Sequence, residues 1–309
     1  MSNSSKIEWT DATWNPVTGC TKVSDGCINC YAVQMSRRLA AMGQEKYAGL
    51  VVPGAPTKDG FTPEWSGKVV CHDSALAEPF KWAQPQMVFV CSMSDLFHDQ
   101  VPWDFLIGVF ATMRLASQHT YQALTKRPGR MAYFANVILP RWYDDLPITL
   151  EALTEASRKR ETYPNAARWW PSNVWAGTSV ESQKYAPRLD VLARVPAPVR
   201  FVSAEPLLSA LDLTKWLNWT GDGGMHEPPN PPAISWCIVG GESGPHARPM
   251  QEEWVRDLRN QCQSAGVAFF YKQAIISGKK IGTPSLDGRQ WMEFPDALQR
   301  PSKSKSSSQ

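Results

Sequence analysis

The stretch Cys20-Thr-Lys-Val-Ser-Asp-Gly-Cys27-Ile-Asn-Cys30-Tyr31-Ala32 places three cysteines within eleven residues near the start of the chain. Thiols clustered this tightly are typical of a metal site. A structural zinc ion takes four protein ligands, whereas three cysteines can hold a four-iron cluster and leave one iron open. The spacing therefore favours an iron–sulfur cluster. A structural zinc completed by a distant His or Asp, and three unliganded thiols, are the alternatives.

Composition indicates one large soluble domain. The chain has 309 residues, 43% of them hydrophobic, and no apolar run approaches the roughly 18 residues of a membrane span. Residues 1–9 lack the apolar region of a secretory signal. Seven cysteines, an odd number, then indicate reduced thiols or ligands rather than a disulfide framework. The net charge of +3 is too mild to identify a nucleic-acid-binding protein, although it permits a local basic groove.

The segments around the cysteines begin a repeating pattern of strand, polar loop and helix. An extended stretch at 13–18 leads into the cysteines, and 31–42 has helical spacing of its apolar residues. The pattern predicts further helices at 74–82, 103–117, 129–137 and from 181 to 193. Short apolar runs predict eight strands, at 13–18, 68–71, 86–91, 121–125, 174–178, 200–204, 235–239 and 267–271. Alternating strands and helices imply parallel units with right-handed crossovers, so we predict an α/β fold, a TIM-like (β/α) barrel that is complete or partial.

The barrel should form a single domain over residues 1–299. Residues 43–67 are rich in Gly and Pro and predict an irregular connection. Two stretches interrupt the pattern, at about 140–172 and 216–232, and we interpret both as insertions near a barrel rim. The serine-rich tail 300–309 is predicted to be disordered.

Polar residues directly after the strands should meet around one mouth, because the carboxyl ends of barrel strands share a face. A buried ion pair that holds loops together is the alternative role for each charged member. Cys71, Cys91, Cys237 and Cys262 lie in apolar strands or on a helix and are interpreted as packing residues. Besides the three clustered cysteines, the candidates are Ser92, Ser94, Asp95, Lys126, Arg127, Ser179, Glu181, Glu205, Gly240, Gly241, Glu242 and Lys272.

Six motifs follow one another between about residues 7 and 273. They are Trp14-Asn-Pro-Val-Thr-Gly-Cys20, Cys27-Ile-Asn-Cys30-Tyr31-Ala32, Ser92-Met-Ser-Asp-Leu-Phe-His98, Leu124-Thr-Lys-Arg-Pro128, Glu205-Pro-Leu-Leu208 and Gly240-Gly-Glu-Ser-Gly244. On these motifs the chain resembles a phage-associated three-Cys-motif family that is regarded as radical S-adenosylmethionine (SAM)-like. The usual radical SAM triplet is CxxxCxxC with an aromatic residue before the third cysteine, whereas here the first gap is six residues and Asn29 precedes Cys30.

The resemblance implies that Cys20, Cys27 and Cys30 hold a [4Fe-4S] cluster whose fourth iron binds the amine and carboxylate of SAM. The reduced cluster would cleave SAM to a 5′-deoxyadenosyl radical, which abstracts hydrogen from a substrate. It also implies an external electron donor and a cytoplasmic location, in a bacterium or a phage-infected host.

Chemistry at the rim suggests which residues bind SAM. Oxygens of Ser92, Ser94 and Asp95 could accept from its ammonium group, and Lys126 or Arg127 could pair with its carboxylate. Glu205 or Glu242 could take a ribose hydroxyl. The radical SAM glycine-rich segment usually follows the second strand, whereas Gly240-Gly241-Glu242 follows the seventh here. Gly240 and Gly241 complete the set of cofactor-binding candidates.

We therefore predict a radical SAM enzyme. Its leading substrate candidate is a nucleic acid or a modified base. The reasons are the phage association that the resemblance implies, the basic residues of 158–160 and of the tail, and the basic and aromatic residues of 168–170. The main alternative is a non-enzymatic or accessory barrel with a structural zinc that binds a protein or nucleic-acid partner. A glycosyl-transfer barrel with a structural zinc and a catalytic Asp such as Asp95 is a third. Hydrolase GxSxG, P-loop and dinucleotide GxGxxG motifs are absent.

Overall fold

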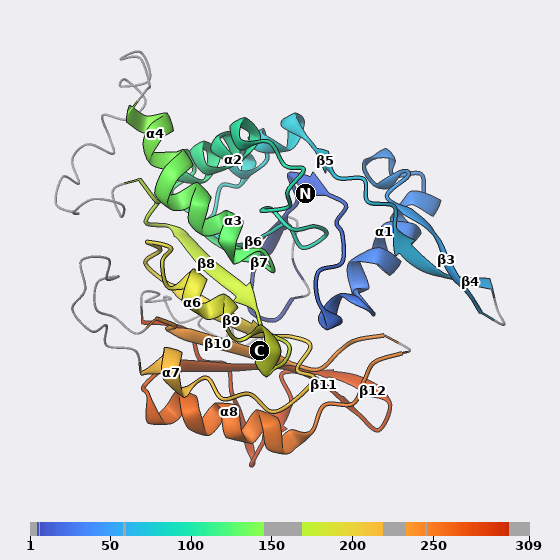
Figure 1. Cartoon of the computed structure of the whole chain (residues 1–309), viewed down its shortest axis with the longest axis vertical. Helices are drawn as coiled ribbons and strands as arrows, with labels where there is room; N and C mark the ends of the chain where they lie inside the picture. The colour runs from blue at the N-terminus through green and yellow to red at the C-terminus, as the bar shows by residue number, and fades with distance from the viewer. Residues whose placement is uncertain are drawn as a thin grey trace, which may run out of the picture.

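The protein is built on one curled sheet of eight strands with helices on its outer side (Figure 1). The computed structural model describes residues 5, 7–57, 60–144, 169–218, 233–244 and 246–296. In spatial order the strands are β1 (Ala12–Trp14), β6 (Met87–Val90), β7 (Thr120–Thr125), β8 (Val174–Ser179), β9 (Arg200–Ala204), β10 (Trp236–Gly240), β11 (Ala268–Ile276) and β12 (Lys279–Gly282).

Seven of these strands run parallel, and the sheet remains open. β12 alone is antiparallel, returning along β11 as a hairpin. Within the described ranges, no pairing joins β1 to β12. β6, β8, β9 and β10 are buried at every position, as expected for parallel strands covered on both faces. The predicted α/β class is confirmed. The curled, open sheet is consistent with the partial form of the predicted barrel, and it does not close into a complete barrel within the described residues.

The strand predicted at 68–71 lies outside this sheet. Only β5 (Val70–Cys71) is extended there, and it pairs antiparallel with β2 (Val17–Thr18). β1 instead pairs directly with β6, with Ala12 opposite Val88. Both residues of β5 are half-buried, so this segment lacks the two covered faces of an inner parallel strand.

The eighth strand of the sheet is β12, which the sequence does not predict. All four of its residues are exposed, and no apolar run marks it. Residues 43–67, predicted to be irregular, contain the turn η2 (Glu45–Tyr47) and a hairpin of β3 (Val51–Thr57) and β4 (Gly60–Trp65). Three prolines are accepted in this hairpin because a two-stranded ribbon has free edges. A further short hairpin joins β13 (Ser285–Leu286) and β14 (Arg289–Gln290).

Most of the predicted helices form. α1 (Tyr31–Ala41) and α2 (Trp103–Leu115) match the predictions closely. The helix predicted at 74–82 is two tight turns, η3 (Asp73–Ala77) and η4 (Pro79–Lys81). The remaining helical segments are η1 (Asp25–Cys27), α3 (Pro128–Tyr133), η5 (Phe134–Ile138), α4 (Leu139–Asp144), η8 (Gln183–Tyr185), α6 (Arg188–Leu192), α7 (Thr214–Leu217) and α8 (Glu252–Ser264). Most of both predicted insertions, and the whole tail, lie outside the described residues.

Two hydrophobic cores cover the two faces of the sheet. The larger lies between the sheet and the helices. The smaller fills the inside of the half-barrel around Trp9, whose ring centroid lies 4.7 Å from Phe89 and 6.0 Å from Trp236. Its other buried members are Met87, Trp175, Val199, Phe201, Ile238 and Phe270. Many of these residues lie near the starts of strands, so they close the interior there and leave the carboxyl ends for polar side chains.

Ile238→Val tests this inner core. Ile238 is fully buried on β10, so loss of one methylene should lower the free energy of unfolding by about 0.5–1.5 kcal/mol. The matched change Ile281→Val on β12 removes the same group from an exposed side chain and should have little effect. Urea denaturation followed by tryptophan fluorescence compares the two. Equal loss in both variants would contradict a packed interior.

Candidate functional site

A cavity of about 340 Å³ opens at the carboxyl ends of the parallel strands. Its size is within the range of small-molecule sites. Segments far apart in sequence line it, including the cysteine stretch, the ends of β6 to β11, and residues of β4 and β12. The predicted candidates that line it are Cys20, Cys27, Cys30, Ser92, Ser94, Asp95, Lys126, Arg127, Ser179, Glu205, Gly241, Glu242 and Lys272. Gly240 and Glu181 are not lining residues, but each adjoins one: Gly240 lies against Glu205, and Glu181 pairs with Lys126.

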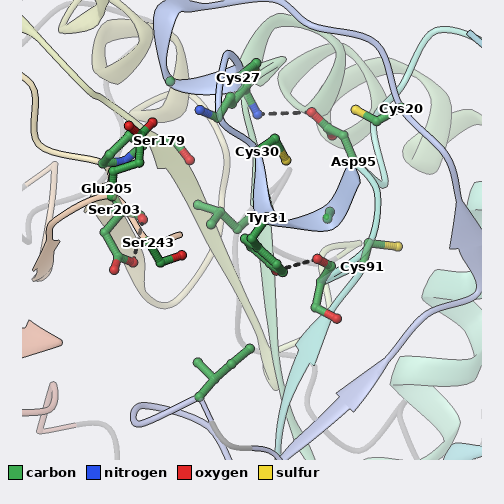
Figure 2. Close-up of a pocket in the computed structure, with 18 of the residues that line it drawn as sticks. Cys20, Cys27, Cys30, Tyr31, Cys91, Asp95, Ser179, Ser203, Glu205 and Ser243 are labelled. Carbon is green, nitrogen blue, oxygen red and sulfur yellow. Dashed lines mark hydrogen bonds between the residues drawn. The ribbon is translucent and has the colours of Figure 1, made fainter. Parts of the chain in front are cut away.

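The three clustered cysteines lie on a loop, residues 19–30, that runs from the β2 end to the start of α1. We call this segment the cysteine loop. All three are free thiols; Cys27 is buried, whereas Cys20 and Cys30 are half-buried. Figure 2 shows them along one side of the cavity. Within the described ranges, no three His, Cys, Asp or Glu side chains are grouped as a metal site. The three thiols thus line the same cavity but do not converge on a common centre.

Burial governs the protonation of these thiols. It raises the pKa of Cys20 to about 12, with a smaller upward contribution from the carboxylate of Asp95. Burial also raises the pKa of Cys30. Both groups are therefore protonated thiols at neutral pH in the metal-free chain, and a metal that binds them must displace their protons.

Asp95, in the loop that follows β6, holds the first part of the cysteine loop in place. Its Oδ1 accepts from Thr125 Oγ1 at 2.6 Å, and its Oδ2 accepts from Arg127 Nη1 at 2.9 Å. Two backbone amides also donate to this carboxylate. Arg127 in turn donates to Thr21 Oγ1 at 2.8 Å and to Cys20 Sγ at 3.9 Å. Asp95 therefore acts on the loop through Arg127.

Glu181, after β8, fastens the middle of the loop. Its carboxylate is fully buried and accepts from Ser24 Oγ at 2.7 Å and from Arg188 Nη1 at 3.0 Å. Lys126 forms a second ion pair with it. A Cβ atom on Gly26 would lie 2.5 Å from the Glu181 side chain, so only glycine allows the loop backbone to approach this closely.

Glu242, after β10, fastens the last part of the loop. Its Oε2 accepts from Asn29 Nδ2 at 2.9 Å and from Arg248 Nε at 3.0 Å. Arg248 also donates to the backbone carbonyl of Asp25 at 2.9 Å. Burial raises the pKa of Glu242, but hydrogen bonds from Arg248 and Asn29 outweigh this effect and hold the pKa below its usual range. Three carboxylates from three strand ends thus position the cysteines.

The predicted serine candidates also have protein partners. Ser92 Oγ donates to Asn15 Oδ1 at 3.1 Å, and Ser94 Oγ donates to the carbonyl of Val17 at 2.8 Å. Both hydroxyl oxygens can still accept a hydrogen bond from a ligand. Their predicted contacts with SAM, like those of Asp95, remain predictions.

Glu205 and Lys272 meet across the end of β10. Glu205 follows β9 and Lys272 lies within β11, the two strands on either side of β10, and Lys272 Nζ lies 3.1 Å from Glu205 Oε1. Ser203 Oγ donates to Glu205 Oε2 at 3.1 Å. A Cβ atom on Gly240, which ends β10, would lie 2.4 Å from Glu205 Oε1, so Gly240 makes room for this carboxylate. Figure 2 shows Glu205 with Ser179, Ser203 and Ser243 across the view from the cysteines.

Tyr31 is a cavity residue for which the sequence predicted no role. The residue is 46% exposed, yet burial is the main cause that raises the pKa of its hydroxyl. The two observations agree if its exposed surface faces the cavity rather than bulk water. The Tyr31 hydroxyl donates to the Ser92 carbonyl at 2.5 Å (Figure 2). An aromatic residue at the start of α1, next to a cysteine, was the signal available in the sequence.

The segments predicted to contact nucleic acid are mostly outside the described residues. Arg158, Arg160 and Arg168 all fall there. Trp170 is described and is buried, with its ring centroid 4.9 Å from that of Phe110. It packs in the larger core between the sheet and the helices, which we call the outer core, and cannot stack on a base, so the prediction is wrong for Trp170.

A family model described as "Protein of unknown function (DUF5131)" matches residues 4–295. The comparisons with curated proteins and with solved structures gave no match. Among the helices that the structure describes, none is long and apolar enough to cross a bilayer. Since the family model covers most of the sequence, the chain belongs to the DUF5131 family.

Proposed function

We propose that the protein is a radical SAM enzyme in which Cys20, Cys27 and Cys30 hold a [4Fe-4S] cluster. One observation carries the proposal. Three free thiols from a single fastened loop line one cavity at the carboxyl ends of parallel strands. Ligand sites of parallel α/β folds lie at this end of the sheet.

The donor set fits such a cluster better than a structural zinc, which needs a fourth protein ligand. Asp95 and His98, which are both linked to the cysteine loop by hydrogen bonds, are candidates for that ligand. The Asp95 carboxylate already accepts four hydrogen bonds. His98 Nδ1 accepts from the amide of Gln100, and its Nε2 bonds Thr21 Oγ1 at 2.8 Å. Three thiolates without a fourth ligand suit a cluster with one open iron.

When bound, the cluster supplies the electron for reductive cleavage of SAM. The chain's own groups bind and enclose the reactants. Ser92, Ser94 and Lys126 are the proposed contacts for the amino-acid end of SAM, and Trp9 lines the floor of the cavity over the inner core. We propose a nucleic acid or a modified base as the substrate and an external protein or small molecule as the electron donor.

Anaerobic reconstitution with iron and sulfide tests the proposal. The wild-type chain should take up about four iron atoms and absorb as a [4Fe-4S] protein. Reduction in the presence of SAM should then release 5′-deoxyadenosine, measured by mass spectrometry against an unreduced control. Stoichiometric zinc without iron, or SAM left intact by the reduced cluster, would overturn the proposal and favour the structural-metal alternative.

A further inference from the structure

Glu205 and Lys272 differ from the other charged groups between the strand ends and the cysteine loop. Asp95, Glu181 and Glu242 each have several donors and hold that loop. Glu205 Oε1 is buried and, within the described residues, has no hydrogen bond. Lys272 Nζ lies 3.1 Å from it, close enough for an ion pair but without hydrogen-bond geometry. Both residues line the cavity, so a carboxylate oxygen and an ammonium group keep hydrogen-bonding capacity at its wall.

The charges of this pair indicate what kind of ligand fits it. One carboxylate and one ammonium are neutral together, so the subsite suits a neutral ligand better than a phosphate. Such a ligand must present a donor to Glu205 and an acceptor to Lys272, side by side. The –NH–C(=O)– edge of a lactam has this arrangement.

The surrounding surface indicates a flat, aromatic ligand. Four aromatic residues line the cavity, and Tyr31 is the most exposed of them. Phe89 and Leu124 add apolar surface. Enzymes that act on a base stack it on aromatic side chains and read its polar edge by hydrogen bonds.

We propose that Glu205, Lys272 and Tyr31 form a subsite for a nucleobase with a lactam edge, such as uracil or guanine. Glu205 accepts from the ring N–H, Lys272 donates to the adjacent carbonyl, and the Tyr31 ring stacks on the base. The inference rests on the proposed function only in taking a base as the substrate. It assigns Glu205 to the substrate rather than to the ribose of SAM.

Calorimetric titration of the metal-free protein with uridine and guanosine tests this subsite. At least one nucleoside should bind, and methylation of its lactam nitrogen, in 3-methyluridine or 1-methylguanosine, should weaken binding about tenfold or more. These comparisons use the wild-type chain and need neither iron nor SAM, so their failure is distinct from failure of the radical SAM proposal. Absence of binding, or equal binding of the methylated nucleoside, would overturn the inference.

Two variants locate the binding. Glu205→Gln should weaken nucleoside binding by a similar factor. Glu253→Gln, the same change at an exposed position on α8, should leave nucleoside binding unchanged. Gly240→Ala should also weaken it, because the new methyl group displaces the Glu205 carboxylate. Thermal melts verify that each variant is folded. If Glu205→Gln weakened the binding of S-adenosylhomocysteine as much as that of the nucleoside, Glu205 and Lys272 would bind the cofactor and the inference would be wrong.

Discussion

Cys27→Ala is expected to remove nearly all iron from the reconstituted protein and to abolish formation of 5′-deoxyadenosine. Cys27 ends η1, in the middle of the cysteine loop, and is the most buried of the three clustered thiols. Three thiolates are the smallest set that leaves one iron open for SAM, so two should not retain a four-iron cluster. Cys20→Ala and Cys30→Ala should have the same effect. Iron content and the visible absorption spectrum are the measurements.

A fourth thiol lines the same cavity and could in principle replace a lost ligand. Cys91 is buried in the outer core, and burial raises its pKa to about 12. In Figure 2 its sulfur points away from Tyr31. Because its thiol faces into the core, we expect no rescue by Cys91.

Cys71→Ala is the matched control for these variants. Cys71 is a half-buried thiol on β5, near the cysteine loop in the fold but outside the cavity lining. The Cys71→Ala variant should bind as much iron as the wild-type chain. Full iron content in Cys27→Ala, or equal iron loss in Cys71→Ala, would contradict the assignment of ligands.

The sequence predicted the inner parallel strands because burial on both faces produces an uninterrupted apolar run. β6, β8, β9 and β10 are buried at every position, and their sequences are mostly apolar. β12 and the β3–β4 hairpin are largely exposed, so they carry no such signal. The short apolar run at 68–71 predicts an inner strand. In the structure only the two half-buried residues of β5 are extended there, and they pair with β2 outside the main sheet. Apolar runs thus indicate that both faces of a strand are buried, but they do not indicate to which sheet the strand belongs.

The sequence predicts that polar residues converge at the carboxyl ends of the strands, but it does not predict which of them form ion pairs and hydrogen bonds with one another. Parallel strands place the residues after their ends on one face, whatever those residues are. Glu181 and Glu205 both follow strands closely, yet the first is saturated by cations and the second keeps an oxygen without a hydrogen bond. This difference depends on Lys126, Arg188 and Lys272 reaching across neighbouring strands, which sequence spacing does not encode.

Glu181→Ala is expected to be among the most destabilising single changes at this site. The carboxylate is fully buried, and its two cationic partners, Lys126 and Arg188, have only 20% and 12% of their side chains exposed. Its removal leaves two poorly solvated cations facing each other and takes away the acceptor of Ser24. Breaking a buried ion pair from one side costs about 3–5 kcal/mol, and the free energy of unfolding should fall by this amount.

Glu252→Ala separates this effect from the general loss of a carboxylate. Glu252 pairs with Arg256 at 2.7 Å on the surface of α8, where water solvates both charges. Its loss should hardly change stability in urea denaturation. Glu181→Gln preserves the side-chain shape and can still accept from Ser24, so it should lie between the two. If Glu181→Ala were no less stable than Glu252→Ala, the buried cluster would not hold the cysteine loop, and the cysteines would depend on Asp95 and Glu242 alone for their position.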